Sequence, residues 1–195
     1  VDSKNNLKQV EKFVNRYLPN LKGKIQLYVK DQPIFEHFNI DVEIERSLSN
    51  KVFLRSGGSL NIDQTEALVS IDVNTGKFVG KNSLEETVYE NNLEAAEEIA
   101  RQLRLRDIGG IIVIDFIDME STKKQQSLLN RFKQELAKDK TRTQVFEISR
   151  LGLVEMTRKN VAAGLVESFS EECEKCNGRG LIINDIFANK SIEEG

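Results

Sequence analysis

Two aspartates stand where apolar runs of this sequence end. Residues 67–73 read ALVSIDV and carry Asp72, and residues 109–115 read GGIIVID and end on Asp115. If the two runs are neighbouring parallel strands, both carboxylates lie at the sheet edge where α/β proteins bind ligands. Two close carboxylates repel each other unless a cation is shared, and Mg²⁺ accepts one or two carboxylates while keeping several waters. We therefore expect Asp72 and Asp115 to hold Mg²⁺, which polarises a phosphate oxygen and lowers the pKa of water.

Two further polar residues follow these strands. Asn74 lies two residues beyond Asp72, where its amide can contact the cation or its ligands, and Asp118 lies three residues beyond Asp115. Aspartates also follow strands as helix caps and turn formers. On spacing alone, the catalytic and the structural interpretation have equal weight.

The two cysteines form a second motif. Cys173 and Cys176 lie in CEKCNGRG, where glycines let backbone amides face sulfur. This spacing is typical of one knuckle of a structural zinc site, which needs four ligands. The sequence has two cysteines, and its one histidine, His37, lies far away. We expect two chains to share one zinc across a two-fold axis; free thiols or a redox pair are the alternatives, although a redox pair usually opens a helix.

Composition limits the class of protein. The 195 residues carry 28 Lys and Arg against 31 Asp and Glu, a net charge of −3. The length allows one sizeable core, there is no apolar run of about 20 residues that could span a membrane, and we expect no signal peptide. Two cysteines favour a reducing compartment. An acidic chain does not hold nucleic acid through its overall field, so such a role requires local sites.

Hydrophobic periodicity predicts an α/β fold. The central order of strand, long helix, strand is a crossover unit, which makes the two strands parallel. Ser83 and Glu86 form a capping box at the start of the long helix, and IIVID lacks polar alternation, which predicts a strand covered on both faces. The expected helices are 4–18, part of 33–48, 84–106 and 123–138, and the expected strands are 24–29, 51–54, 60–63, 67–73, 111–115 and 143–149.

Four longer stretches resemble the ribonuclease E/G family, and their residues are more similar to its G branch than to its E branch. The resemblance runs from about residue 24 to 180. The stretches are GGSLNIDQTEALVSIDVNTGKFVG (57–80), NNLEAAEEIARQLRLRDIGGIIVIDFIDM (91–119), SRLGLVEMTRK (149–159) and CEKCNGRG (173–180).

The resemblance implies a DNase I-like catalytic core with a partial RNase H-like subdomain and a zinc-knuckle linker. The implied boundaries are 1–47 for the RNase H-like part, 48–168 for the catalytic domain, 169–180 for the zinc link and 181–195 for the start of a small dimerisation domain. It also implies a fragment that lacks the upstream RNA-binding and 5′-sensor domains.

The resemblance assigns roles to individual residues. Asp72 and Asp115 match the metal-binding catalytic aspartates, and Asn74 matches the asparagine that orients them. Arg142 matches an arginine of the pocket that senses a 5′ monophosphate. Cys173 and Cys176 match the cysteines that share zinc between subunits, although Glu174 stands where the family commonly has proline.

The implied activity is Mg²⁺-dependent endoribonuclease cleavage of single-stranded RNA, leaving 5′-phosphate and 3′-hydroxyl ends, in RNA processing and decay. Flanking phosphates would contact basic residues, for which a solvated charged face is the alternative: Arg104, Arg106, Arg142 and Arg158. The expected assembly is a zinc-linked homodimer, with a higher oligomer in the full-length protein. The expected location is the bacterial cytoplasm or a plastid stroma. The alternative function is a weak or inactive fragment that serves as a zinc-linked dimerisation module or binds RNA or protein.

Overall fold

The computed structural model describes residues 1–195 except 77–83, 160–163, 177, 179 and 183–195. The chain divides into two compact units, residues 1–49 and 50–195. In the described part, no helix combines the length and the apolarity needed to cross a membrane. The expected capping box lies partly outside the described residues, because Ser83 is one of the residues left out.

The first unit consists of helices. Its helices are α1 (Lys4–Tyr17), the short 3₁₀ helix η1 (Pro19–Leu21), α2 (Ile34–His37) and α3 (Ile40–Leu48). The helix expected within 33–48 is interrupted, because Asn39 adopts a left-handed conformation with φ 55° and separates α2 from α3. The strand expected at 24–29 is wrong: the described chain has no strand there, although the Tyr28 amide donates to the Val1 carbonyl.

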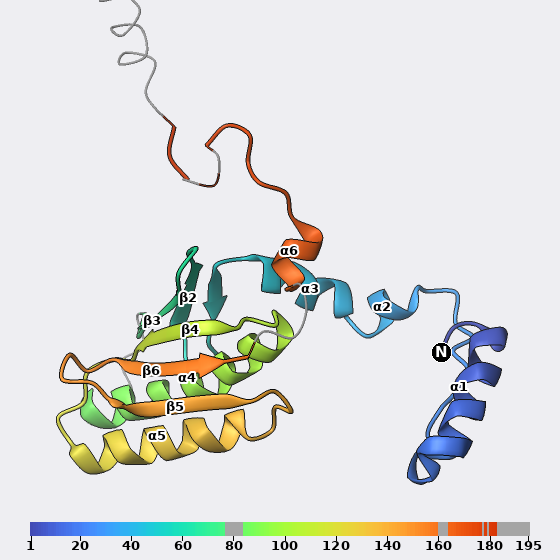
Figure 1. Ribbon diagram of the computed structural model, residues 1–195, viewed down its shortest axis with the longest axis horizontal. Coiled ribbons are helices and arrows are strands. Elements are labelled where there is room, and N and C mark those ends of the chain that lie inside the picture. Colours follow the sequence, from blue (N-terminus) through green and yellow to red (C-terminus); the bar gives the residue numbers. More distant parts are fainter. Residues whose placement is uncertain (77–83, 160–163, 177, 179, 183–195) are drawn as a thin grey trace, which may run out of the picture. The chain divides into compact units, whose positions relative to one another are not determined.

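The second unit is built on a six-stranded sheet with the order β1-β2-β3-β4-β6-β5 (Figure 1). The strands are β1 (Lys51–Phe53), β2 (Ser59–Gln64), β3 (Val69–Asn74), β4 (Gly110–Asp115), β5 (Thr143–Ile148) and β6 (Val154–Arg158). Strands β3 and β4 are parallel, as the crossover predicts, and the other neighbours are antiparallel. The α/β class is therefore confirmed, whereas β6 was not expected, because its residues were read only as a motif.

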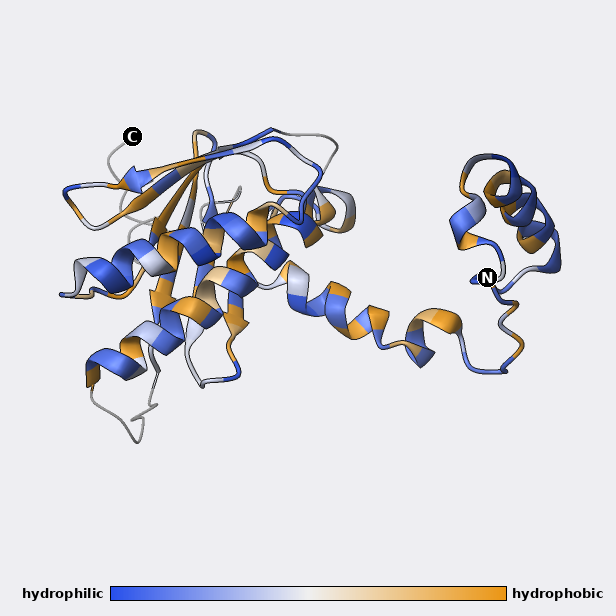
Figure 2. Cartoon of the chain, turned by 90° about the horizontal axis from the view of Figure 1, so that it is seen from below, coloured by the Kyte–Doolittle hydropathy of each residue, from blue (hydrophilic) through white to orange (hydrophobic). Residues whose placement is uncertain are grey.

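Two long helices cover one face of this sheet. Helix α4 (Leu84–Leu105) makes the β3–β4 crossover, and α5 (Thr122–Leu136) packs beside it (Figures 1 and 2). The core between helices and sheet includes the fully buried side chains of Ile112, Leu103 and Phe132. A short helix, α6 (Leu165–Phe169), follows β6.

The opposite face of the sheet is open in the described structure. Strand β3 alternates strictly between buried and exposed residues, and on β4 Ile111 is 54% exposed. The expectation that β4 is covered on both faces is therefore wrong. An unbroken apolar run hid the alternation, because Ile111 and Val113 of the open face are as apolar as Ile112 and Ile114 of the core.

Candidate functional site

Asp72 and Asp115 are paired neighbours on the parallel strands β3 and β4. Asn61 of β2 lies opposite Asp72, so Asn61, Asp72 and Asp115 form one row across three strands. Adjacent strands are about 4.8 Å apart, and paired residues of neighbouring strands project to the same face. Both aspartates are exposed, whereas Ile71 and Ile114 beside them are buried. The open face therefore carries two accessible carboxylates near the carboxyl ends of the two parallel strands.

Asn74 contacts one of these carboxylates directly. Its Nδ2 donates a hydrogen bond of 2.6 Å to Asp72 Oδ2. Residues two apart on a strand share a face, which explains how the Asp-x-Asn spacing brings the two groups together. The bond restrains the Asp72 carboxylate, which is an orienting contact of the kind expected for Asn74.

A glycine turn packs closely against the loop after β3. Gly58 belongs to the turn between β1 and β2, and a Cβ on it would lie 2.7 Å from the Asn74 carbonyl oxygen. Gly76 has φ +63°, and a Cβ there would overlap the Gly57 carbonyl. The backbones approach too closely for any side chain, so glycine is required at both positions for this turn to contact residues 74–76.

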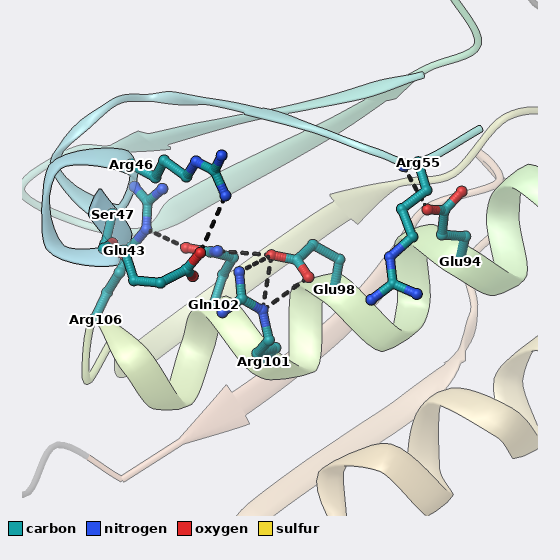
Figure 3. A network of polar contacts seen from close by, with 9 residues as sticks. All are labelled: Glu43, Arg46, Ser47, Arg55, Glu94, Glu98, Arg101, Gln102 and Arg106. Atoms are coloured by element: carbon teal, nitrogen blue, oxygen red, sulfur yellow. Dashed lines mark hydrogen bonds and ion pairs between the residues drawn. The ribbon is translucent and has the colours of Figure 1, made fainter. Parts of the chain in front are cut away.

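One polar turn of α4 supports the loops on both sides of the aspartate pair. Asn92 is fully buried; its Nδ2 donates to the Ile117 carbonyl at 2.8 Å and its Oδ1 accepts from the Ile117 amide at 3.0 Å. Glu94 accepts a hydrogen bond of 2.6 Å from the Arg55 amide (Figure 3) and one of 3.0 Å from the Ser56 amide. Sequence analysis missed Asn92; its signal was a polar residue within the buried stripe of an amphipathic helix.

The loop after β4 also meets the hairpin between β5 and β6. A Cβ on Gly152 would lie 3.4 Å from Asp118 Oδ1. Asp118 is exposed at the same end of the sheet as Asp115. It therefore lies near the carboxylate pair, on the loop that Asn92 holds.

The four arginines expected to hold phosphates lie at the other end of the sheet. Arg158 pairs with Gly110, the first residue of β4, and with Thr143 at the start of β5, directly after Arg142. Arg104 and Arg106 lie at the end of α4, just before β4 begins. Five strand residues, about 16 Å, separate that end from Asp115. The structure does not bring these arginines together with the aspartates.

Arg158 and Arg106 are also buried, each 4% exposed. Arg158 forms ion pairs with Asp107 at 2.8 Å and Asp139 at 2.9 Å, and it donates to the Ile108 carbonyl. Neither phosphate binding nor a solvated face describes such a side chain, and both expectations are corrected for Arg158. Its buried contacts tie the starts of β4 and β5 together.

Arg106 is part of a polar chain along α4. Its Nε donates to Gln102 Oε1 at 2.8 Å, and Gln102 in turn donates to Glu98 (Figure 3). Burial lowers the pKa of the Arg106 guanidinium, while the charge of Glu98 acts to raise it. Arg106 also helps to line a cavity of about 90 Å³, together with Asp107 and Glu167. This cavity lies far from Asp72 and Asp115. The burial and acidic surroundings of Arg106 do not support the phosphate contact expected for it.

The remaining two arginines are more accessible. Arg142 is exposed, and its backbone carbonyl accepts from the Lys159 amide. Arg104 is partly buried and donates to the Glu135 carbonyl at 3.3 Å. Their contact with RNA stays a prediction.

Cys173 and Cys176 form a compact turn. The Cys176 amide donates to the Cys173 carbonyl at 3.3 Å, and the Gly180 amide donates to Cys176 Sγ at 3.3 Å. The amides of Cys176 and then Lys175, together with the Cys176 side chain, lower the pKa of the Cys173 thiol. Amides directed at sulfur suit a thiolate ligand, so the donor set fits half of a zinc site. Both cysteines are free thiols.

The aspartate pair fits a magnesium ion in its donor chemistry. Two exposed carboxylates on adjacent strands match the one or two that Mg²⁺ takes from a protein. Among the described residues, no group of three or more His, Cys, Asp or Glu side chains could hold a metal. The remaining ligands of an ion there would have to be waters or substrate oxygens, as is usual for Mg²⁺.

Comparison with known proteins gives a consistent result. The profile of the Ribonuclease E/G family matches residues 1–161. The chain is 46% identical over 182 residues to ribonuclease G of Escherichia coli K12, and 43% identical over 182 residues to ribonuclease G of Haemophilus influenzae. Both alignments cover 93% of the chain and 37% of the relative. It is 46% identical over 174 residues to ribonuclease E of E. coli K12, which covers 89% of the chain and 16% of that protein.

Proposed function

The chain belongs to the ribonuclease E/G family, and we propose on that basis that it carries the catalytic carboxylates of a magnesium-dependent endoribonuclease. It spans 37% of the length of the ribonuclease G relatives it matches, so the activity of the whole protein is part of the proposal. The observation that supports the proposal most strongly is the pairing of Asp72 with Asp115 on adjacent parallel strands.

The proposed reaction is hydrolysis of a phosphodiester bond in single-stranded RNA. Asp72 and Asp115 would hold Mg²⁺, which supplies positive charge that stabilises the phosphate oxygens and acidifies water. Asn74 restrains the Asp72 carboxylate through its 2.6 Å hydrogen bond, so that group is oriented before the metal and substrate arrive. The products would carry 5′-phosphate and 3′-hydroxyl ends, and the reaction would serve RNA processing and decay.

The site is open enough for a polymer. Asp72 and Asp115 lie on an exposed sheet face, and Ile111 on that face is 54% exposed. An internal stretch of RNA can reach an exposed face without threading a free end. This accessibility favours endonucleolytic over exonucleolytic cleavage.

A zinc-linked pair is the assembly we propose. Cys173 and Cys176 supply two sulfur ligands, and a structural zinc takes four. Two copies of the chain would complete the set across a two-fold axis. The same knuckle supports the second candidate function, a fragment that is weak in catalysis and serves mainly in dimerisation or in binding RNA or protein. The bacterial relatives favour a cytoplasmic setting.

Two parallel incubations separate the two functions. A 5′-monophosphorylated single-stranded RNA with an internal fluorophore is mixed with the chain, once with Mg²⁺ and once with EDTA. Internal cuts that require Mg²⁺ support the enzyme. RNA binding without cuts supports the binding module and contradicts a catalytic role for this chain.

A further inference from the structure

The hairpin between β5 and β6 has a rigid tip. The Ser149 amide donates to the Leu153 carbonyl at 2.8 Å, and the Gly152 amide donates to the Ser149 carbonyl at 3.0 Å. Ser149 Oγ also accepts from the Leu153 amide at 3.2 Å. Gly152 has φ +82°, which permits the tight turn. The two residues between Ser149 and Gly152 are therefore presented in a fixed position.

This tip lies at the edge of the sheet that carries the aspartates. Val154, the first residue of β6, pairs with Ile114, the residue before Asp115. Gly152 lies close to Asp118 of the loop after β4, at 3.4 Å for a Cβ built on it. The tip thus lies at the same end of the sheet as Asp72 and Asp115, unlike the four arginines at the opposite end.

The tip carries an accessible cation. Arg150 is exposed, and Leu151 beside it is 83% exposed. Within the part of the chain that the structure describes, the Arg150 guanidinium has no hydrogen bond or ion pair. Phosphates that approach this edge meet the negative charges of Asp72, Asp115 and Asp118. An arginine that is not committed to the fold can offset that repulsion and bind a phosphate in a bidentate manner.

A second arginine lies on the other side of the aspartates. Arg55 is exposed in the turn between β1 and β2, and Glu94 fixes that turn through the backbone amides of Arg55 and Ser56. This turn packs against the loop after β3, because a Cβ on Gly58 would meet the Asn74 carbonyl. No hydrogen bond or ion pair of the Arg55 guanidinium is found among the residues described. Its side chain extends alongside α4 in Figure 3, so contact with a phosphate at the strand ends requires rotation about its side-chain bonds. Four strand spacings, roughly 19 Å, separate the two arginine-bearing turns.

We propose that Arg150 and Arg55 bind backbone phosphates of single-stranded RNA on either side of the aspartate pair. The inference rests on the proposed function and adds the path of the RNA. The RNA crosses the strand ends between the β1–β2 turn and the β5–β6 hairpin. Both turns are held by hydrogen bonds, so the backbone that carries each arginine has a defined position. Sequence analysis missed this arrangement, because Arg150 lies inside a motif whose hairpin was not expected.

Binding to RNA that cannot be cut tests the inference separately from catalysis. The probe is a fluorescein-labelled 12-nucleotide 2′-O-methyl RNA, measured by anisotropy with the full chain in EDTA, at several salt concentrations. The variants are Arg150→Gln and Arg55→Gln. The matched control is Lys133→Gln, which removes one exposed charge from α5, on the helix-covered side of the sheet. Thermal melts establish that all three variants are folded.

We expect each arginine variant to bind roughly tenfold more weakly at low salt, and the control less than twofold more weakly. The slope of log affinity against log salt should fall by about 0.7 for each phosphate of a single strand that the variant no longer neutralises. Equal affinities for Arg150→Gln and Lys133→Gln would overturn the inference, as would no binding by the unaltered chain at millimolar concentration. Normal binding by the unaltered chain with no cleavage of ordinary RNA would instead overturn the proposed function alone.

Discussion

Asp72 and Asp115 face the same side of the sheet from directly paired positions on β3 and β4. Asn61 extends the row on one side, and the next row toward the middle of the sheet contains Ser70, Val113 and Glu155. Both carboxylates lie near the strand ends whose adjoining loops are held by Asn92 and Glu94 of α4. This arrangement lets substitutions separate the catalytic role of a carboxylate from its presence on the face.

Replacing Asp115 by Asn should reduce cleavage of single-stranded RNA at least a thousandfold. The amide keeps the shape but cannot supply a carboxylate for Mg²⁺. Because Asp115 is exposed, the melting temperature should change by less than about 2 °C, as is usual for surface substitutions. Glu155→Gln is the matched control, an exposed carboxylate of the same face that should leave cleavage intact. Full activity in Asp115→Asn would remove Asp115 from the mechanism.

Replacing Asn92 by Ala should damage the site as well as the fold. The change leaves the Ile117 amide and carbonyl without their buried partner, which costs about 2–4 kcal/mol. We expect the amide hydrogen of Ile117 to exchange with solvent much faster. We also expect the loop between Asp115 and Asp118 to lose its defined conformation. The midpoint of Mg²⁺ activation should rise about tenfold, measured in cleavage reactions.

The control for Asn92 is Gln102→Ala, which removes another buried amide from the same helix, far from the aspartates. It should cost comparable stability in urea unfolding but leave the Mg²⁺ midpoint unchanged. If both variants shift the midpoint equally, Asn92 acts only through global stability.

Asp139 should make stability depend on pH in the acid range. Burial acts to raise its pKa, but hydrogen bonds from the Thr141 amide and Arg158 outweigh this, so its pKa lies below that of an ordinary aspartate. Since the folded pKa is below the unfolded one, the stabilisation is complete above about pH 4 and is lost as the pH falls through the folded value. Asp139→Asn should lose about 1–3 kcal/mol at pH 7. Urea unfolding from pH 7 to pH 2 should show a smaller acid-induced loss in the variant than in the unaltered chain.

Zinc content should report the assembly. We expect one zinc per two chains by elemental analysis, together with a dimeric mass by light scattering. Cys173→Ser should lose zinc and dissociate, because a structural zinc site needs its full set of four ligands. Glu174→Ala is the control, which leaves both sulfurs in place. A monomer that carries no zinc would contradict the shared site.

The part of the site that could be predicted follows from the local pattern. The strand, helix, strand order places Asp72 and Asp115 at one edge, because a crossover makes the strands parallel, and Asn74 shares a face with Asp72 through its two-residue spacing. The long helix α4 was expected within one residue of its observed end, because its buried positions repeat at helical spacing.

What could not be predicted depends on contacts between distant residues. Arg158 resembles any exposed cation in sequence, and only the pairing of β4, β6 and β5 shows that Asp107 and Asp139 enclose it. The open face of β4 was hidden because Ile111 is apolar and yet exposed. Residues 24–29 alternate like a strand, but a strand also needs a hydrogen-bonded neighbour, which periodicity does not reveal.

The most direct test of the central claim is the position of a paramagnetic substitute for Mg²⁺. Substoichiometric Mn²⁺ is added to the ¹⁵N-labelled chain, and the loss of amide signals is recorded by NMR. We expect the amides of Asp72, Asn74 and Asp115 to broaden first, excess Mg²⁺ to restore them, and the Asp72→Asn, Asp115→Asn double variant to show no such effect. Broadening that is absent at these residues, or that persists unchanged in the double variant, would contradict the shared metal site.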